Sequence, residues 1–336
     1  MANISLAIKI GSSNTLIFKQ GEGIVLSEPS MVAVAKQGKS RVLRAVGTRA
    51  KRLLGRTDKA TEVVSPVFRG VIVDSELAEA MLKVYLNKIV PKTFRKPNIR
   101  AIVCVPIGLS AVEAKTFEKV CLNCGIGEVI LVPSVLCGAT GMSLPILSSA
   151  SSFVVEMGGS TTDLAVISAG NIVSGMSIGL GGMDLDVAIE NFVATEMKLL
   201  IGSDTAEKIK TEIASLYQND NSNMEIFGVD TVTNQSRTDV ISASDIYPVV
   251  SEHYQKIAIA IRDLLNTCSP EIVADVSNEG VVVCGGSAKM QGIEQFLTNK
   301  LGINVSVDES ADYIETIGAG KLLSDAKTLK EVLYYL

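Results

Sequence analysis

The segment that decides the fold is 152–162, which reads SFVVEMGGSTT. Its first half is an apolar run typical of a buried strand, and its second half is a turn of Gly, Ser and Thr. The segment 4–15, ISLAIKIGSSNT, has the same order of strand and small-residue turn. A return strand follows each turn, at 15–19 and at 163–168. This internal repeat predicts two related α/β units facing each other across a cleft, with both turns pointing into it.

The rest of the sequence predicts the other strands and helices of these two units. Further strands are predicted at 23–26, 30–34, 99–106, 129–132, 171–176 and 279–284, with a small β insertion at 219–238. Helices are predicted at 75–86, from 110, at 207–215, 248–267 and 293–301, and from 317 as the last helix.

The composition indicates a folded protein without a nucleic-acid partner. The chain has 336 residues, of which 47% are hydrophobic and 20% charged, and a net charge of -5. Nucleic-acid binders normally present a basic face. We find no apolar leader and no run near the eighteen apolar residues of a spanning helix, so we expect a cytoplasmic location. With a single histidine, His253, zinc binding by Cys121 and Cys124 is disfavoured, and the six cysteines are expected to be reduced core residues.

Three turns could together bind phosphates and a base. Small residues let backbone N–H groups approach an anion, and hydroxyl groups add donors, at 11–15 and at 158–162. Gly285 and Gly286 precede a helix, whose N-terminus favours negative charge. The alternative is three ordinary tight turns, which the duplication disfavours.

These motifs resemble the MreB family of bacterial actins. Further similar segments are 23–30 (GIVLSEPS), 54–57 (LGRT), 70–74 (GVIVD), 79–82 (EAML), 199–202 (LLIG), 205–210 (TAEKIK) and 270–275 (PEIVAD). The resemblance runs in order from about Leu6 to about Leu323. It implies an actin-like fold of four subdomains, ATP with magnesium between two lobes, and assembly into filaments that organise cell shape beneath the membrane. The expected divisions are lobe I at 1–146 with a small subdomain at about 33–66, lobe II at 147–311 with one at about 181–242, and a C-terminal helix in 312–336 that returns to lobe I.

The resemblance also implies which residues would contact the nucleotide. The expected phosphate contacts are Gly11, Ser12, Ser13 and Asn14 from lobe I and Gly158, Gly159, Ser160 and Thr161 from lobe II. The expected adenosine-side contacts are Glu207, Lys210, Gly181, Gly182, Gly285, Gly286 and Ser287. Met183 stands where the family usually has an acidic residue after the glycine pair.

Three positions that carry chemistry in the family differ in this chain. Lys9 replaces an aspartate before the first phosphate loop, Glu156 replaces one before the second, and Ser134 stands where the family has its water-positioning glutamate. Serine cannot act as a general base without a partner. We therefore expect ATP or ADP as ligand, no usual Mg²⁺ site, and hydrolysis that is absent or very slow. Lys9 either replaces part of the metal's charge toward phosphate or extends to water beside the pocket.

The partners remain open at this level. Phe94 lies among Lys88, Lys92, Arg95 and Lys96, which could anchor the chain at a membrane surface. The alternative is a solvated basic loop with a buried phenylalanine. Expected partners are the chain itself, an intact MreB paralogue, and cell-wall or membrane proteins. The alternative functions are an active ATPase of the wider actin, sugar-kinase and chaperone superfamily, or a nucleotide-sensing adaptor that does not polymerise.

Overall fold

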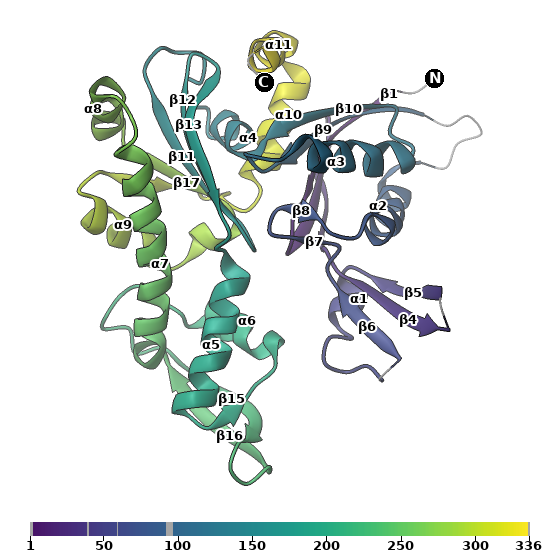
Figure 1. Cartoon of the computed structure of the whole chain (residues 1–336), viewed down its shortest axis with the longest axis vertical. Helices are drawn as coiled ribbons and strands as arrows, with labels where there is room; N and C mark the ends of the chain where they lie inside the picture. The colour runs from purple at the N-terminus through teal and green to yellow at the C-terminus, as the bar shows by residue number, and fades with distance from the viewer. Residues whose placement is uncertain (1–2, 39, 59, 92–96, 335–336) are drawn as a thin grey trace.

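The structure is a computed structural model that describes residues 3–38, 40–58, 60–91 and 97–334. Figure 1 shows two sheet-rich lobes side by side, with helices α4, α10 and α11 near the top between them. Each lobe extends downward into a smaller part that contains its own short sheet.

The two central sheets have the same topology. In lobe I the order is β10-β9-β1-β2-β3, and in lobe II it is β18-β17-β11-β12-β13. In each, the first strand pairs antiparallel with its return strand and parallel with a later strand. The bounds in lobe I are β1 Asn3–Ile10, β2 Asn14–Lys19, β3 Gly23–Pro29, β9 Asn98–Val105 and β10 Glu128–Pro133. Those in lobe II are β11 Ser152–Met157, β12 Thr162–Ser168, β13 Asn171–Ile178, β17 Val281–Cys284 and β18 Val305–Val307. The predicted duplication is therefore confirmed.

Strand alternation divides the core of lobe I. Leu6, Ile8 and Ile10 on β1 join the buried cluster that contains side chains of α2 (Ser75–Ile89) and α3 (Ala111–Asn123). Ala7, on the opposite face, joins the cluster formed with α4 (Ser134–Gly141) and α10 (Ile314–Ser324). The alternation thus places helices on both faces of the sheet, as a strand buried on both sides requires.

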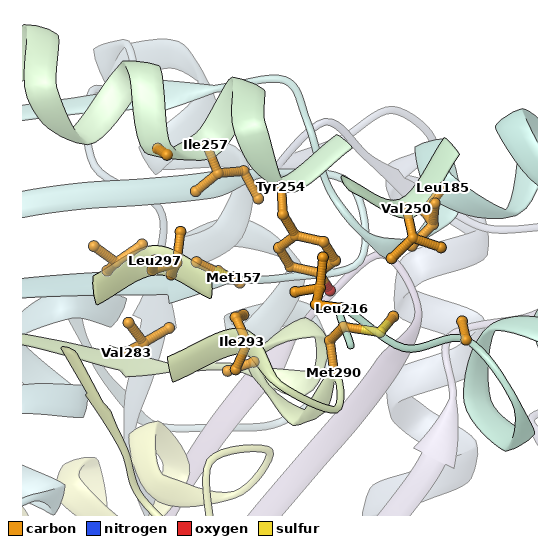
Figure 2. Packing of buried hydrophobic residues seen from close by; sticks show 14 of the residues in the cluster. Met157, Leu185, Leu216, Val250, Tyr254, Ile257, Val283, Met290, Ile293 and Leu297 are labelled. Atoms are coloured by element: carbon orange, nitrogen blue, oxygen red, sulfur yellow. The ribbon is translucent and has the colours of Figure 1, made fainter. Parts of the chain in front are cut away.

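Lobe II has its own core on the side of α7 (Ala243–Leu265) and α9 (Ile293–Leu301). Figure 2 shows Tyr254 and Ile257 of α7 above Met157 and Val283 of the sheet, with Leu297 of α9 beside them. Helix α8 (Pro270–Glu279) follows α7 on the same lobe, and a 3₁₀ turn, Gly286–Lys289, follows β17.

Each lobe carries a smaller sheet at its lower end. The one in lobe I has the order β5-β4-β6, and the one in lobe II has the order β14-β15-β16. Their bounds are β4 Val32–Gln37, β5 Ser40–Val46, α1 Thr48–Lys51, β6 Thr61–Val64, β14 Leu199–Leu200, β15 Asn223–Asp230 and β16 Ser236–Ser242. The paired strands β7 Val67–Phe68 and β8 Val71–Ile72 lead back to lobe I, and α5 (Gly182–Glu196) and α6 (Ser203–Glu212) complete the lower part of lobe II.

Several predicted elements need correction. The strand expected at 30–34 does not pair with 23–26, because β4 belongs to the separate small sheet. The helix expected at 248–267 begins five residues earlier, since Ser242 and Asp245 form a capping box and Pro248 is accommodated in the first turns. The helix expected at 207–215 is α6, shifted toward the N-terminus, and the last helix is followed by another, α11 (Ala326–Tyr334). Helices α5 and α8 were not predicted.

The lobes meet where α4 crosses α10. A Cβ on Gly318 would overlap the carbonyl oxygen of Cys137, and one on Gly141 would overlap that of Ile314. The two helices therefore approach backbone to backbone, which only glycine permits. Among the described residues, no helix is long and apolar enough to cross a membrane.

Candidate functional site

A cleft of about 450 Å³ lies between the lobes. The predicted residues that line it are Lys9, Gly11, Ser12, Ser13, Asn14, Ser134, Glu156, Gly158, Gly159, Ser160, Thr161, Gly182, Glu207, Lys210, Gly286 and Ser287. Gly181 and Gly285 do not line it, and Phe94 lies outside the described residues. The structure thus gathers almost all of the predicted contacts around one cavity.

The two small-residue loops contact each other across the cleft. The hydroxyl oxygens of Ser12 and Ser160 are 2.5 Å apart, so one donates to the other. Each loop is closed by its own backbone bond, such as that from the Gly158 N–H to the Thr161 carbonyl at 2.8 Å. A Cβ on Gly159 would overlap the Ser13 hydroxyl, so this approach requires glycine.

The glycine pair 181–182 packs against the loop at 158–161 and so positions the start of helix α5. The Gly182 N–H donates to the Gly158 carbonyl at 3.1 Å, and the Met183 N–H donates to the Gly159 carbonyl at 2.7 Å. A Cβ on Gly181 would lie 2.6 Å from the backbone of Gly159. These two hydrogen bonds therefore hold the N-terminus of α5 against the loop at 158–161.

Lys210 of α6 lines the cleft. Its ammonium donates to the Gly182 carbonyl at 3.0 Å and to Asp186 at 2.8 Å. Burial raises the pKa of Asp186, and the neighbouring Lys210 opposes that rise. Asp186, three residues after Met183, is therefore the acidic partner of Lys210.

The loop after β17 has a structural glycine followed by lining residues. Gly285 has φ +92°, and a Cβ there would overlap the Met157 carbonyl oxygen. The Ser287 hydroxyl donates to the Gly158 carbonyl at 2.9 Å, and the Tyr254 hydroxyl donates to the Ser287 carbonyl at 2.7 Å. Tyr254 also lines the cleft and was missed, because nothing distinguishes it in sequence from other core residues of its helix.

Lys9 forms a buried ion bridge with two carboxylates at the floor of the cleft. Its ammonium lies 3.0 Å from an oxygen of Glu156 and also contacts the carboxylate of Glu315. The side chains of Lys9, Glu156 and Glu315 are 18%, 4% and 1% exposed. Lys9 and Glu156 are the penultimate residues of β1 and β11, and Glu315 is the second residue of α10. Glu315 was not predicted as a site residue.

The charges at the floor perturb one another. Burial lowers the pKa of Lys9, but Glu156 and Glu315 raise it more, so the net pKa lies well above its usual value. Burial, and then the charge of Glu156, raise the pKa of Glu315 well above its usual value. The same two causes raise the pKa of Asp163, which lies opposite Glu156 on β12, to about 7. Lys9 therefore remains charged at neutral pH, whereas the neighbouring Asp163 titrates near neutral pH.

This donor set does not fit Mg²⁺. That ion requires oxygen ligands in near-octahedral geometry, and here an ammonium group occupies the space between the carboxylates. In the described part of the chain, no cluster of three or more acidic, cysteine or histidine side chains is arranged to hold a metal. The Lys9 ammonium contacts Glu156 and Glu315, and the Lys9 side chain lines the cleft and is 18% exposed. Its role toward phosphate stays a prediction from the sequence.

Two further contacts join the lobes and were not predicted. Arg69, between β7 and β8, donates from its backbone to the Ser160 hydroxyl at 3.0 Å and from its guanidinium to Asp184 at 2.7 Å. At the mouth, Lys51 of α1 lies 2.5 Å from Glu207 of α6. The side chains of Lys51 and Glu207 are 31% and 40% exposed, so solvent screens this pair.

Three cysteines surround the ion bridge. Cys104, Cys137 and Cys284 are at most 3% exposed, and none of the six cysteines is in a disulfide. The Cys104 thiol points to the Glu315 carbonyl at 3.9 Å. Burial raises the pKa of Cys284 well above its usual value. These thiols are core residues, as predicted.

A larger, more open groove of about 1080 Å³ lies elsewhere on lobe II. It runs between residues 216–220, α7 and α9, and its lining includes Tyr217, Tyr247 and Phe296. None of the predicted site residues that the structure describes lines this groove, so the interlobe cleft is the candidate site.

The chain is similar in sequence to MreB and Mbl proteins. The family model described as MreB/Mbl protein matches residues 3–331. The cell shape-determining protein MreB of Escherichia coli (strain K12) is 35% identical over 326 residues, which cover 96% of this chain and 94% of that protein. The cell shape-determining protein Mbl of Bacillus subtilis (strain 168) is 36% identical over 326 residues, covering 96% and 97%.

Solved structures agree with the sequence comparison. MreB5 of Spiroplasma citri bound to AMPPNP superimposes with a TM-score of 0.92 at 28% identity, over 98% of this chain and 99% of that one. The MamK double helical filament matches with a TM-score of 0.79 at 17% identity, over 96% and 99%, which shows the fold alone. The predicted actin-like fold is confirmed, and the chain belongs to the MreB/Mbl family.

Proposed function

We propose that this chain is a filament-forming cytoskeletal protein that acts in cell shape or spatial organisation, and that its cleft binds ATP or ADP without normal hydrolysis. Its relatives from E. coli and B. subtilis are named as cell shape-determining proteins. The S. citri relative has been solved with AMPPNP and with ADP, which supports nucleotide binding in the same fold.

The observation that carries the proposal is the contrast between retained loops and altered floor. Both small-residue loops, with Ser12 and Ser160 in contact, still line the cavity with glycine and hydroxyl-bearing residues of the kind that bind phosphates. At the floor, where the family resemblance implies metal-binding aspartates, Lys9 is instead bridged to Glu156 and Glu315. Binding groups are therefore kept while the metal-dependent groups are replaced.

The charge balance predicts modest affinity. One ammonium between two carboxylates leaves no net positive charge facing the phosphates, so affinity has to come from neutral donors. Hydrogen bonds from neutral donors contribute about half as much as charge-assisted ones. Ser134 is 3% exposed at the start of α4 and supplies no base to activate water.

The test combines sedimentation with a phosphate-release assay. Purified protein is pelleted at high speed with no nucleotide, with ATP and EDTA, and with ATP and Mg²⁺, while released phosphate is measured in each sample. We expect pelleting in all three conditions and no magnesium-dependent phosphate release. Pelleting only with ATP and Mg²⁺, accompanied by turnover, would support the active ATPase. Protein that never pellets but binds labelled ADP would support the adaptor.

Membrane contact and partners extend this proposal. Phe94, Lys92, Arg95 and Lys96 lie outside the described residues, whereas Lys88 on α2 pairs with Glu28, so the anchor remains a prediction from sequence. Liposome flotation of the parent and of Phe94→Ser tests it, and equal flotation of both removes Phe94 as an anchor. We also propose that a subunit with this altered floor co-assembles with an intact MreB paralogue, which co-pelleting of the two proteins would detect.

A further inference from the structure

The ion bridge at the cleft floor crosses from lobe I to lobe II through the contact between Lys9 and Glu156. Lys9 belongs to the central sheet of lobe I, and Glu156 belongs to the central sheet of lobe II. Glu315 begins α10, which packs against α4 and β1 at the crossing between the lobes. A single ammonium group therefore connects both sheets and the crossing helices.

Further contacts reinforce the same closed arrangement above the floor. The Ser12 and Ser160 hydroxyls meet where the two loops converge. Arg69 donates to the Ser160 hydroxyl and carbonyl, at 3.0 and 3.2 Å, and to Asp184. All of these contacts are made by the chain's own atoms.

How deeply a contact is buried determines how strongly it opposes separation of the lobes. The pair at the cleft mouth is about a third exposed and contributes little, since water replaces it. At the floor, opening would carry Lys9 away from Glu156, which is 4% exposed, while Glu315 would stay beside Lys9 because α10 packs against β1. A buried carboxylate that loses its cation is strongly disfavoured, so the bridge opposes separation of the lobes.

We propose that the Lys9–Glu156–Glu315 bridge holds the cleft closed in the nucleotide-free protein. A metal ion arrives and leaves with its nucleotide, whereas the Lys9 ammonium is covalently part of β1. Closure is then a permanent property of the chain and does not wait for a ligand. The consequence for assembly, that the closed subunit is always available, rests on the proposed filament function, but closure itself does not.

Hydrogen exchange of the monomer, followed by mass spectrometry, tests the proposal. The protein is stripped of nucleotide with apyrase and EDTA and is kept at a concentration where sedimentation velocity shows monomers. Exchange is then compared with and without ADP in peptides covering 67–70 and 158–162. In the wild type we expect exchange in both peptides to differ less than about twofold on adding ADP, because buried, bonded amides exchange only through opening.

The variants separate the bridge from general stability. In Lys9→Met and Glu156→Gln we expect exchange of both peptides to be faster by on the order of tenfold without ligand. Lys36→Met is the matched control, because Lys36 pairs with Glu62 inside one small sheet, where their side chains are 64% and 51% exposed. Its exchange should match the wild type. If Lys9→Met does not fold, Glu156→Gln decides, since it keeps the side-chain volume and removes only the charge.

Two outcomes would overturn the proposal. One is a wild type whose two peptides exchange rapidly until ADP protects them, which would mean that nucleotide closes the cleft. The other is wild-type exchange in a folded Glu156→Gln variant, which would mean that the bridge does not hold the lobes. A protein that is closed by this measure but never pellets would refute only the filament function.

Discussion

Replacing Lys9 with methionine should destabilise the protein strongly, and more so at alkaline than at acidic pH. The change leaves Glu156 and Glu315, 4% and 1% exposed, without their shared cation. At 3.0 Å and an effective dielectric constant of about 20, one such contact has a gross Coulomb energy of about 5 kcal/mol. Removing one partner of a buried ion pair costs about 3–5 kcal/mol, and we expect a loss in that range at pH 8.

The pH dependence follows from which group can respond. The pKa of Lys9 is raised, so its charge and its contribution are constant between pH 5 and 8. Without Lys9 the pKa of Glu315, already raised, rises further, and protonation at pH 5 relieves part of the penalty. The loss should therefore be smaller at pH 5 than at pH 8, because protonation removes the uncompensated buried charge.

Urea unfolding followed by far-ultraviolet circular dichroism measures both quantities, because the chain contains no tryptophan. Lys36→Met, which removes an exposed ion pair, should cost no more than about 1 kcal/mol at either pH. A loss below about 1 kcal/mol for Lys9→Met at pH 8, or an equal loss at both pH values, would refute the reasoning that this bridge is buried and structural.

Three other substitutions test separate features. Asp163 has its pKa raised to about 7, so between pH 4 and pH 7 the folded state holds a proton there that the unfolded state releases. The stability of the wild type should therefore fall by on the order of a few kcal/mol from pH 4 to pH 7. Asp163→Asn should flatten this decline, as measured by urea midpoints. Gly318→Ala places a methyl group against the Cys137 carbonyl and should cost about 1–3 kcal/mol, seen as a lower thermal midpoint. Lys51→Ala removes the exposed pair with Glu207 and should change stability by less than about 1 kcal/mol while speeding release of fluorescent ADP about two- to fivefold.

Each of these three substitutions has a control or an outcome that would contradict it. Gly202→Ala introduces a methyl group into open space and should leave the thermal midpoint nearly unchanged, unlike Gly318→Ala. Lys208→Ala removes an exposed pair with Asp204 on the same helix as Glu207 and should not alter ADP release. Parallel pH curves for the wild type and Asp163→Asn would assign the decline to another group.

The fold could be read from sequence because its main signals are local and repeated. The apolar strand before the small-residue turn occurs at 4–15 and again at 152–162, and the duplication implied the facing lobes. Elements without such a signal were missed. Helix α5 starts at a glycine pair that reads as a turn, and the start of α7 was misplaced because Pro248 suggested a helix beginning.

The residues of the candidate site also fall into those that the sequence predicted and those that it did not. Residues of the small-residue loops were predicted because their spacing is contiguous in sequence, as at 11–14 and 158–161. Glu315 was not, because its role depends on α10 returning from the other end of the chain to meet β1. The altered charge of Lys9 was visible in the sequence, but what neutralises it was not.

The three thiols beside the ion bridge allow the rate of lobe opening to be followed by covalent chemistry. Cys104, Cys137 and Cys284 are at most 3% exposed, so an aqueous thiol reagent reaches them only after the surrounding packing opens. When opening is rare and labelling of the open form is slow, the labelling rate reports the fraction of open molecules; when labelling is fast, it reports the opening rate itself. The unmodified chain thus contains its own reactive reporters of conformational kinetics, located at the crossing of the two lobes.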